Sequence, residues 1–309
     1  MTSPDRRGQV VLVTGASSGI GLATAQQLAE EGASLVLASR SEEALERAAK
    51  SCPDPDAVLT VPTDVGDGDA VQSLFDGARD RFGHVDAVVH AAGVLAYGRF
   101  EEVPADVFED VVRTNVLGTG HVARSALRAF REQGHGNLVV IGSVVGKIAA
   151  ASMSNYQTSK WAVHGLVRAL QVEARRTPGV DVTLVSPGGV DTPIYTQAGN
   201  YEGWEGRPPP PVSSPQRVAR RVVHAVDHPQ RELSVGFANH VMVLGFRLLP
   251  GLYDVMVTPL MRSLAMSSRP VPASPGNTGR PHEQDEGLRG RWKRPTPVDL
   301  VQGLIGRRT

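Results

Sequence analysis

Short apolar segments alternate with amphipathic segments along most of the chain. Six apolar segments have the length of a β-strand and are continuously rich in Val, Leu or Ile, which is typical of strands covered on both faces. A regular alternation with segments of helical length predicts a parallel sheet with right-handed crossovers. The expected strands are Val10–Val13, Ser34–Ala38, Ala57–Val61, Val85–Val89, Asn137–Ile141 and Val180–Val185, and the expected helices span 20–31, 41–51, 67–82, 104–132, 156–176 and 213–227.

Residues 8–236 are therefore predicted to form one α/β domain with a doubly wound parallel sheet. Leu233–Gly236 is expected to add an edge strand, which makes about seven strands. The segment 188–212 contains two glycines, three aromatic residues and a run of prolines. A connection of that length inside a compact domain is usually functional, so we expect it to form a substrate loop.

The chain beyond the domain divides into two parts. Residues 237–266 continue an apolar stretch that starts at Leu233 and is interrupted by charged residues and prolines. We favour one or two helices packed on the sheet edge or across a dimer; a substrate cover or a peripheral membrane contact is the alternative. Residues 267–309 are rich in Pro, Gly and Arg, with eight basic and four acidic residues, and are predicted to be a mostly disordered basic tail.

Composition narrows the class of protein. The 309 residues are 41% hydrophobic and 21% charged, as in ordinary globular proteins. Lys and Arg together number 32, as do Asp and Glu, so nothing points to nucleic acid as a partner. The single cysteine, Cys52, excludes an internal disulfide and suits the cytoplasm. The apolar run Val10–Val13 is too short for a secretory signal, and no run reaches the length of a membrane span.

The first predicted strand ends in a glycine-rich turn, TGASSGIG (Thr14–Gly21), and a helix follows at once. Such glycines let the backbone turn tightly and let a diphosphate approach the N–H groups at the positive end of the helix, as in Rossmann domains. The same letters match the Gly-x-Ser-x-Gly elbow of serine hydrolases, with Ser17 as nucleophile. That elbow needs an oxyanion loop from an earlier strand, and fourteen residues precede Gly15, so we favour dinucleotide binding.

A second group of residues carries a family resemblance. Ser143 is followed thirteen residues later by Tyr156, and Lys160 lies four residues further on. Together with the glycine turn, this set resembles the short-chain dehydrogenase/reductase family over roughly Val10 to Gly236. The motifs in the family's order are Thr14-Gly15-x3-Gly19-x-Gly21, Asp64-Val65, Ala92-Gly93, Asn115, Ser143, Tyr156-x3-Lys160 and Pro187-Gly188-x3-Thr192.

The resemblance implies hydride transfer between a nicotinamide and a carbonyl or alcohol. It makes Tyr156 the proton donor or acceptor, Lys160 its activator and a ribose contact, and Ser143 the group that holds the substrate oxygen. Asn115 would hold a water that relays protons to Lys160. Free tyrosine has a pKa near ~10, so work near neutral pH asks for a lower pKa, which a neighbouring ammonium and an oxidised nicotinamide favour.

The end of the second predicted strand decides the expected cofactor. An acid there selects NAD, whereas a nearby arginine accepts the 2′-phosphate of NADP. Here Ser39 takes the acid's place and Arg40 follows, so we expect NADP(H). The resemblance places the other cofactor contacts at Gly15, Ser17, Ser18, Gly19, Ile20, Gly21, Asp64, Val65, Ala92, Gly93, Asn115, Tyr156, Lys160, Pro187, Gly188, Val190 and Thr192.

One position departs from the family pattern. Where the family often has Asn-Asn-Ala-Gly, this chain has His90-Ala91-Ala92-Gly93. Both asparagine side chains are absent, so their hydrogen bonds must come from His90 or from elsewhere. The sequence leaves this open.

The expected substrate wall includes Val144 and the loop 193–211, which are apolar or aromatic and suggest a hydrophobic ketone, alcohol or steroid-like compound. The expected substrate contacts are Ser143, Val145, Met153 and Tyr156. A homo-oligomer is the family expectation. The alternatives are a non-catalytic dinucleotide-binding sensor and a nucleotide-sugar epimerase, whose glycine spacing differs. His224 and His228 have no visible third ligand, so no metal site is predicted.

Overall fold

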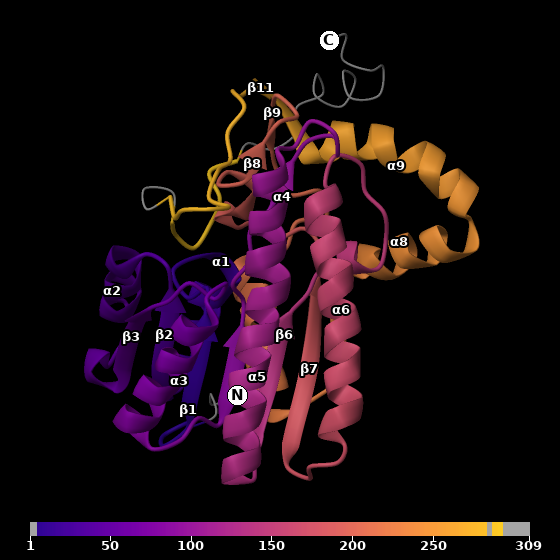
Figure 1. Cartoon of the computed structure of the whole chain (residues 1–309). Helices are drawn as coiled ribbons and strands as arrows, with labels where there is room; N and C mark the ends of the chain where they lie inside the picture. The colour runs from indigo at the N-terminus through magenta and orange to yellow at the C-terminus, as the bar shows by residue number, and fades with distance from the viewer. Residues whose placement is uncertain (1–4, 283–285, 293–309) are drawn as a thin grey trace.

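The computed structural model describes residues 5–282 and 286–292, and its centre is one parallel sheet (Figure 1). Seven strands lie in the order β10-β7-β6-β4-β1-β2-β3, and every neighbouring pair is parallel. This confirms the predicted doubly wound α/β fold, including the edge strand. The strands are β1 (Val10–Thr14), β2 (Ser34–Ser39), β3 (Val58–Pro62), β4 (Ala87–His90), β6 (Gly136–Ile141), β7 (Val180–Pro187) and β10 (Glu232–Val235).

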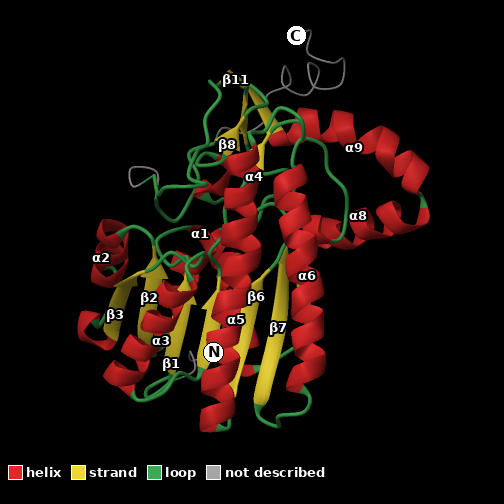
Figure 2. Ribbon diagram, in the orientation of Figure 1, coloured by secondary structure: helices red, strands yellow, loops and turns green. Residues whose placement is uncertain are grey.

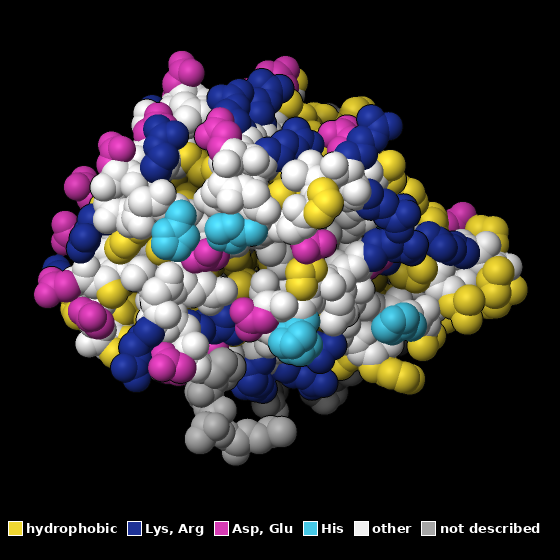
Figure 3. Space-filling view, turned by 90° about the horizontal axis from the view of Figure 1, so that it is seen from below, with side chains coloured by type: hydrophobic (Ala, Val, Ile, Leu, Met, Phe, Trp, Pro, Cys, Tyr) yellow, Lys and Arg dark blue, Asp and Glu magenta, His cyan; other side chains and the backbone are white. Residues whose placement is uncertain are grey.

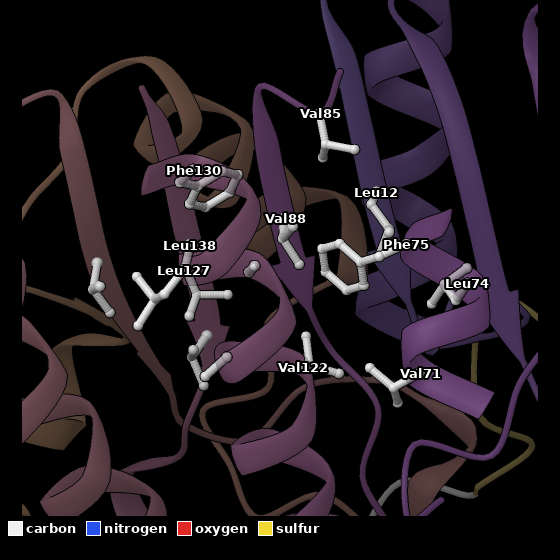
Figure 4. Close-up of a cluster of buried hydrophobic side chains, with 14 of the residues drawn as sticks. Leu12, Val71, Leu74, Phe75, Val85, Val88, Val122, Leu127, Phe130 and Leu138 are labelled. Atoms are coloured by element: carbon white, nitrogen blue, oxygen red, sulfur yellow. The ribbon is translucent and has the colours of Figure 1, made fainter. Parts of the chain in front are cut away.

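Helices cover both faces of the sheet. One face carries α3 (Gly68–Phe82), α5 (Gly118–Gln133) and α6 (Ser154–Ala174), and the other carries α1 (Gly19–Glu30), α2 (Glu42–Lys50) and α7 (Pro215–Asp227). Figure 4 shows part of the first core layer, in which helix side chains meet strand side chains. The buried residues drawn there include Val71, Leu74 and Phe75 from α3, Val122, Leu127 and Phe130 from α5, and Leu12, Val88 and Leu138 from the strands.

Local chemistry sets several helix ends. Asp67 caps α3 by accepting hydrogen bonds from the N–H groups of Asp69 and Ala70. The same helix ends at Gly83, whose φ of +83° belongs to the left-handed region that glycine adopts readily. These ends lie within a residue of the predicted limits 67–82.

The helix expected over 104–132 is interrupted. It consists of α4 (Ala105–Val112), a π-helical turn at Arg113–Leu117 and α5. Single π-helical turns inside α-helices are frequent at functional sites. The turn contains Asn115, one of the predicted site residues.

The carboxyl ends of the strands carry further short elements (Figure 2). The loop 188–212 contains a 3₁₀ turn at Pro193–Tyr195 and the strands β8 (Gly199–Asn200) and β9 (Trp204–Gly206). β8 pairs with β5 (Ala96–Tyr97), and β9 pairs with β11 (Met266–Pro270). The expected substrate loop is thus held to the domain by two small sheets.

The apolar segment forms a hairpin of two helices, α8 (Phe237–Leu248) and α9 (Pro250–Ala265). The first turn of α8 is held at the sheet edge, because Asn239 donates hydrogen bonds to the carbonyls of Ser186 and Val235. Beyond that turn the hairpin projects from the body (Figure 1), so the predicted packing on the sheet edge is limited to the start of α8, and packing across a dimer stays a prediction. The buried Arg207 fastens the far end of α9 by donating to the carbonyls of Leu264 and Ser263.

Part of the predicted tail is ordered against the domain. β11 runs antiparallel to β9, Ser274 forms a bridge with Asn200, and Trp292 Nε1 donates to Asp191 Oδ1 at 2.6 Å. The prediction of disorder is therefore wrong for residues 267–282 and 286–292. The backbone of 267–282 finds hydrogen-bond partners in the loop 188–212, and 286–292 is held by the bond from Trp292 and by the Gly287 carbonyl, which accepts from the N–H of Gly19. Residues 293–309, which the same prediction covered, lie outside the described residues.

Candidate active site

Two adjoining cavities lie at the carboxyl ends of the strands, where doubly wound sheets bind ligands. The larger has a volume of about 380 Å³ and the smaller about 140 Å³. The predicted cofactor residues from Gly15 to Gly21 line the smaller cavity, and Ser143, Tyr156 and Lys160 line the larger one. The two cavities share the wall residues Ile20, Ala91, Gly93, Thr192 and Ile194.

Two glycines make the turn after β1 compact. Gly15 has a φ of +67°, and a Cβ there would lie 2.7 Å from the backbone nitrogen of Ala92. A Cβ on Gly21 would lie 2.1 Å from the carbonyl oxygen of Gly15. Side chains at these positions would therefore separate the turn from α1 and from the end of β4. The result is a groove at the N-terminus of α1, where the helix dipole favours an anion.

The donors expected to bind phosphate have partners within the chain. Arg40 Nη1 and Nη2 donate to the carbonyls of Thr278 and Asn277, at 3.1 and 2.6 Å. The N–H of Gly19 donates to the carbonyl of Gly287 at 3.0 Å. Burial lowers the pKa of Arg40, yet a guanidinium in a protein stays charged. The C-terminal segment thus crosses the groove in which the cofactor contacts were predicted.

Asp64, expected to touch the adenine, lines the smaller cavity and is paired. Its carboxylate accepts from Arg113 Nη1 at 2.9 Å and from the N–H of Gly66 at 2.9 Å. Burial alone would raise the pKa of Asp64, but the bonds from Gly66 and Arg113 outweigh it and lower the pKa. Asp64 therefore anchors the π-helical turn as well as lining the groove.

Ser143, Tyr156 and Lys160 come together where the larger cavity meets the groove. Ser143 follows β6, and its hydroxyl accepts from the N–H of Val145 at 3.2 Å and is hydrogen-bonded to Tyr156. Lys160 Nζ donates to the carbonyl of Ile141 at 3.0 Å and lies over the Tyr156 ring, 5.6 Å from its centroid. Because Tyr156 and Lys160 are four residues apart on α6, both face this wall.

Burial controls the protonation of this pair. It raises the pKa of Tyr156 to about 12, against the lowering effect of the bond to Ser143. It also lowers the pKa of Lys160 to about 8. The shift on Tyr156 is opposite to the one that an activated phenolate needs, because desolvation of the buried phenol dominates. Tyr156 is therefore protonated near neutral pH, which is the form that can donate a proton.

Asn115 uses its amide to join three parts of the site. Its Oδ1 accepts from the N–H of Val94, and its Nδ2 donates to the Val94 carbonyl and to Ser159 Oγ, each at 2.9 Å. A Cβ on Gly93 would lie 3.3 Å from Asn115 Oδ1 and 3.7 Å from Lys160 Nζ. The Asn115 amide oxygen and the Lys160 ammonium thus both lie on the side of Gly93 that a side chain would occupy. Its role in holding a water stays a prediction.

The other predicted residues divide between the two cavities. Ser17, Ser18, Val65 and Ala92 line the groove, as do the shared residues Ile20, Gly93 and Thr192. The larger cavity takes in the expected substrate wall and the expected carboxamide loop. It is lined by Val144, Val145, Met153, Pro187, Gly188 and Val190.

Two residues of the site escaped the sequence analysis. His164, one helical turn after Lys160, has Nε2 at 3.1 Å from the carbonyl of Ser143 and so holds the backbone of that residue. Burial lowers the pKa of His164 to about 4, so the ring is neutral. Tyr97 is fully buried on the wall of the larger cavity. The position of His164 four residues after Lys160 was a usable signal, whereas Tyr97 carried none.

In the described part of the chain no group of three or more His, Cys, Asp or Glu side chains could hold a metal ion. His224 and His228 stack on one another, with ring centroids 4.3 Å apart. Among the same residues, no helix is both long and apolar enough to cross a bilayer.

Comparison with known proteins places this geometry in a family. Residues 9–202 match the family model of the short chain dehydrogenases. An uncharacterized oxidoreductase of Staphylococcus aureus strain USA300 is 37% identical over 222 residues, which are 72% of this chain and 92% of the relative. The uncharacterized oxidoreductase YxnA of Bacillus subtilis is 31% identical over 269 residues, 85% of this chain and 75% of its own.

Solved structures agree. A short chain dehydrogenase/reductase from Burkholderia phymatum, in complex with NAD, superposes with a TM-score of 0.70 at 28% identity and covers 82% of this chain and 96% of its own. A variant of the actinorhodin polyketide ketoreductase, with NADPH, has a TM-score of 0.66 at 30% identity and covers 76% and 97%. The chain therefore belongs to the short-chain dehydrogenase/reductase family and is an oxidoreductase of that type.

Proposed function

We propose that the protein reduces a hydrophobic carbonyl compound with NADPH, or oxidises the corresponding alcohol with NADP⁺. The observation that carries the proposal is the position of Ser143, Tyr156 and Lys160. They line the larger, largely apolar cavity at its junction with a groove lined by the glycine turn. A hydride donor in the groove and a carbonyl in the cavity would meet beside these three side chains.

The groove suits a dinucleotide. Gly15 and Gly21 keep side chains out of the turn, and the N-terminus of α1 offers N–H groups and a positive dipole to a diphosphate. Arg40 at the end of β2 has the position and charge for the 2′-phosphate of NADP. Residues 277–278 and 287 hold the same donors, so the C-terminal segment has to shift when the phosphates bind.

The chain's own residues supply the proton and the alignment. The bound nicotinamide provides or accepts the hydride. The Ser143 hydroxyl hydrogen-bonds the substrate oxygen, and Tyr156 Oη gives that oxygen its proton as negative charge develops. The buried Lys160 ammonium favours the phenolate left on Tyr156, and His164 fixes the backbone of Ser143. In the oxidative direction the same groups act in reverse.

A side-by-side fluorescence titration with NADPH and NADH tests the cofactor assignment. Tighter binding of NADPH supports the groove and the Arg40 assignment together. Tighter binding of NADH retains the reaction and overturns the role of Arg40. Binding of neither dinucleotide would contradict the proposed function and return attention to Ser17 as a hydrolase nucleophile.

A further inference from the structure

The α8–α9 hairpin carries most of the large hydrophobic side chains that are exposed in the described chain. Nine of the thirteen large hydrophobic side chains that are exposed there lie between Phe237 and Leu260. Monomeric soluble proteins rarely expose a contiguous apolar patch of this kind without a binding role. The nine are Phe237, Val241, Leu244, Leu248, Leu249, Leu252, Val255, Met256 and Leu260.

These side chains gather on a lobe that projects from the body. Figure 3 shows hydrophobic side chains over the projecting lobe, where α8 and α9 meet (Figure 1). The tip of the lobe is Leu248-Leu249-Pro250-Gly251-Leu252, and all five residues are exposed. A narrow apolar tip of this shape can enter a soft acyl layer, whereas a stable protein interface needs a broad complementary face.

The same hairpin also borders the active site. Met242, Tyr253 and Val257 line the larger cavity, which Tyr156 lines as well. Five of the nine exposed side chains line it too, namely Val241, Leu249, Leu252, Met256 and Leu260. The Tyr253 hydroxyl donates to the carbonyl of Ala149 at 2.7 Å and so closes the hairpin over the cavity. An apolar compound that leaves a lipid layer at the tip could therefore reach Tyr156 along a route lined by apolar side chains.

Charge on the hairpin matches a lipid surface of negative sign. From Phe237 to Ala265 the charged residues are Arg247, Asp254 and Arg262, a net charge of +1. Arg247 and Arg262 are both exposed and lie in the last turns of α8 and α9. Basic residues at the margin of an apolar helical face add attraction to anionic headgroups.

We propose that the α8–α9 tip inserts into an anionic lipid surface and that the enzyme takes a long-chain, lipid-soluble carbonyl compound from it. The substrate part of this inference rests on the proposed function, and the docking surface does not. The helices of the hairpin have 12 and 16 residues, so the hairpin lies in one leaflet and does not span the bilayer.

Flotation with vesicles of phosphatidylcholine and phosphatidylglycerol in equal parts tests the docking surface. The test variant, called the tip variant below, is Leu248→Glu combined with Val255→Glu, two exposed positions of the hairpin that do not line the larger cavity. Each change replaces an apolar side chain by a charged one, so the tip variant should bind the vesicles at least about tenfold more weakly. Phe100→Glu, on an exposed residue of the body that is 68% accessible, is the matched control and should bind as the wild type does.

Measurements of turnover separate the docking surface from the substrate assignment. With NADPH, the tip variant should lose reduction of 2-heptadecanone held in the vesicles and keep reduction of cyclohexanone in solution. Wild-type protein that does not float, or a tip variant that floats equally well, overturns the docking surface. A tip variant that changes from dimer to monomer, with no flotation by either protein, assigns the face to a second copy and also overturns it. Flotation without reduction of either ketone contradicts the proposed function and leaves the docking surface supported.

Discussion

His90 Nδ1 lies 2.8 Å from Thr14 Oγ1, so one imidazole joins the ends of β4 and β1. Its Nε2 lies 3.0 Å from Thr119 Oγ1, whose proton goes to the carbonyl of Asn115 at 2.6 Å. His90 Nε2 therefore carries the hydrogen, and Nδ1 accepts from Thr14. Burial, with a smaller contribution from Lys160, lowers the pKa of His90 to about 3 and keeps the ring neutral. The hydrogen bonds of His90 therefore take the place of those that the two asparagine side chains of the family pattern would make.

Replacing this histidine should destabilise the fold. In His90→Leu both threonine hydroxyls lose a buried partner, and the free energy of unfolding should fall by about 2–4 kcal/mol. Urea denaturation followed by circular dichroism measures the change. His135→Leu, on an exposed side chain paired with Asp86, is the control and should cost less than about 1 kcal/mol. Equal losses in the two variants would show that the bridge adds nothing.

Arg40 should decide between the two cofactors. Arg40→Asp removes a charge-assisted partner of the 2′-phosphate and adds a repulsive charge, so the Kd for NADPH should rise by about 10- to 100-fold. The Kd for NADH should change much less. Arg79→Asp, an exposed change on α3, controls for the altered net charge. Unchanged NADPH affinity in Arg40→Asp would refute the assignment.

The C-terminal segment should compete with the cofactor for Gly19. Gly287 holds the N–H of Gly19, and the bond from Trp292 to Asp191 anchors this part of the segment. A contact that holds the segment over Gly19 weakens the binding of any ligand that needs the same N–H group. Trp292→Phe keeps an aromatic side chain but loses the hydrogen bond to Asp191. Because such a bond is worth about 1 kcal/mol, the variant should bind NADPH about fivefold more tightly.

Isothermal titration calorimetry measures this change without relying on tryptophan emission. Trp161→Phe is the matched control, since Trp161 Nε1 donates to the carbonyl of Ile148 at 3.1 Å. We expect no change in NADPH affinity there. Equal or weaker binding in Trp292→Phe would mean that the segment does not compete.

Lys160 should make stability depend on pH. Its pKa is about 8 in the folded protein against 10.5 as the ordinary value, so between these limits the unfolded chain binds a proton that the folded chain lacks. The free energy of unfolding therefore rises with pH across this window, by up to about 3 kcal/mol. Lys160→Met removes this rise. The free energy of unfolding of Lys160→Met minus that of the wild type should therefore be larger below pH 8 than at pH 10.5.

The difference between the two proteins is the quantity to measure, by urea denaturation at several pH values. Tyr156 and Tyr195 have pKa values that burial raises, so near pH 10 and above they lower the stability of both proteins alike. Parallel pH profiles for wild type and Lys160→Met would contradict the lowered pKa of Lys160.

The local sequence was sufficient to predict most strands and helices of the central domain. β1 and β2 start at the predicted residues and each extends one residue further than expected, because continuous apolar runs identify strands covered on both faces. Ser143, Tyr156 and Lys160 were predicted from the family resemblance that their spacing carries, and the structure brings the three to the wall of one cavity, after β6 and on α6.

Long-range pairing was not predictable in the same way. β11 pairs with β9 across roughly sixty residues of chain, and its sequence, Met266–Pro270, has no alternation or turn to announce a strand. The carbonyls that hold Arg40 belong to residues that a Pro/Gly-rich composition marks as unstructured. The bond from His164 to Ser143 likewise depends on how α6 packs: the spacing places His164 on the helix face of Lys160, but it does not identify the partner of the ring.

Hydride transfer with Tyr156 as the proton donor is tested most directly by mass spectrometry of the alcohol formed from a hydrophobic ketone, with NADPH deuterated at the transferable position of the nicotinamide. Wild-type protein should place one deuterium on the carbinol carbon. Tyr156→Phe should lower the rate by about 10²–10⁴-fold while binding NADPH as tightly. Tyr201→Phe, a change away from the cavity walls, should match the wild type. Product without deuterium, or full activity in Tyr156→Phe, would contradict the account.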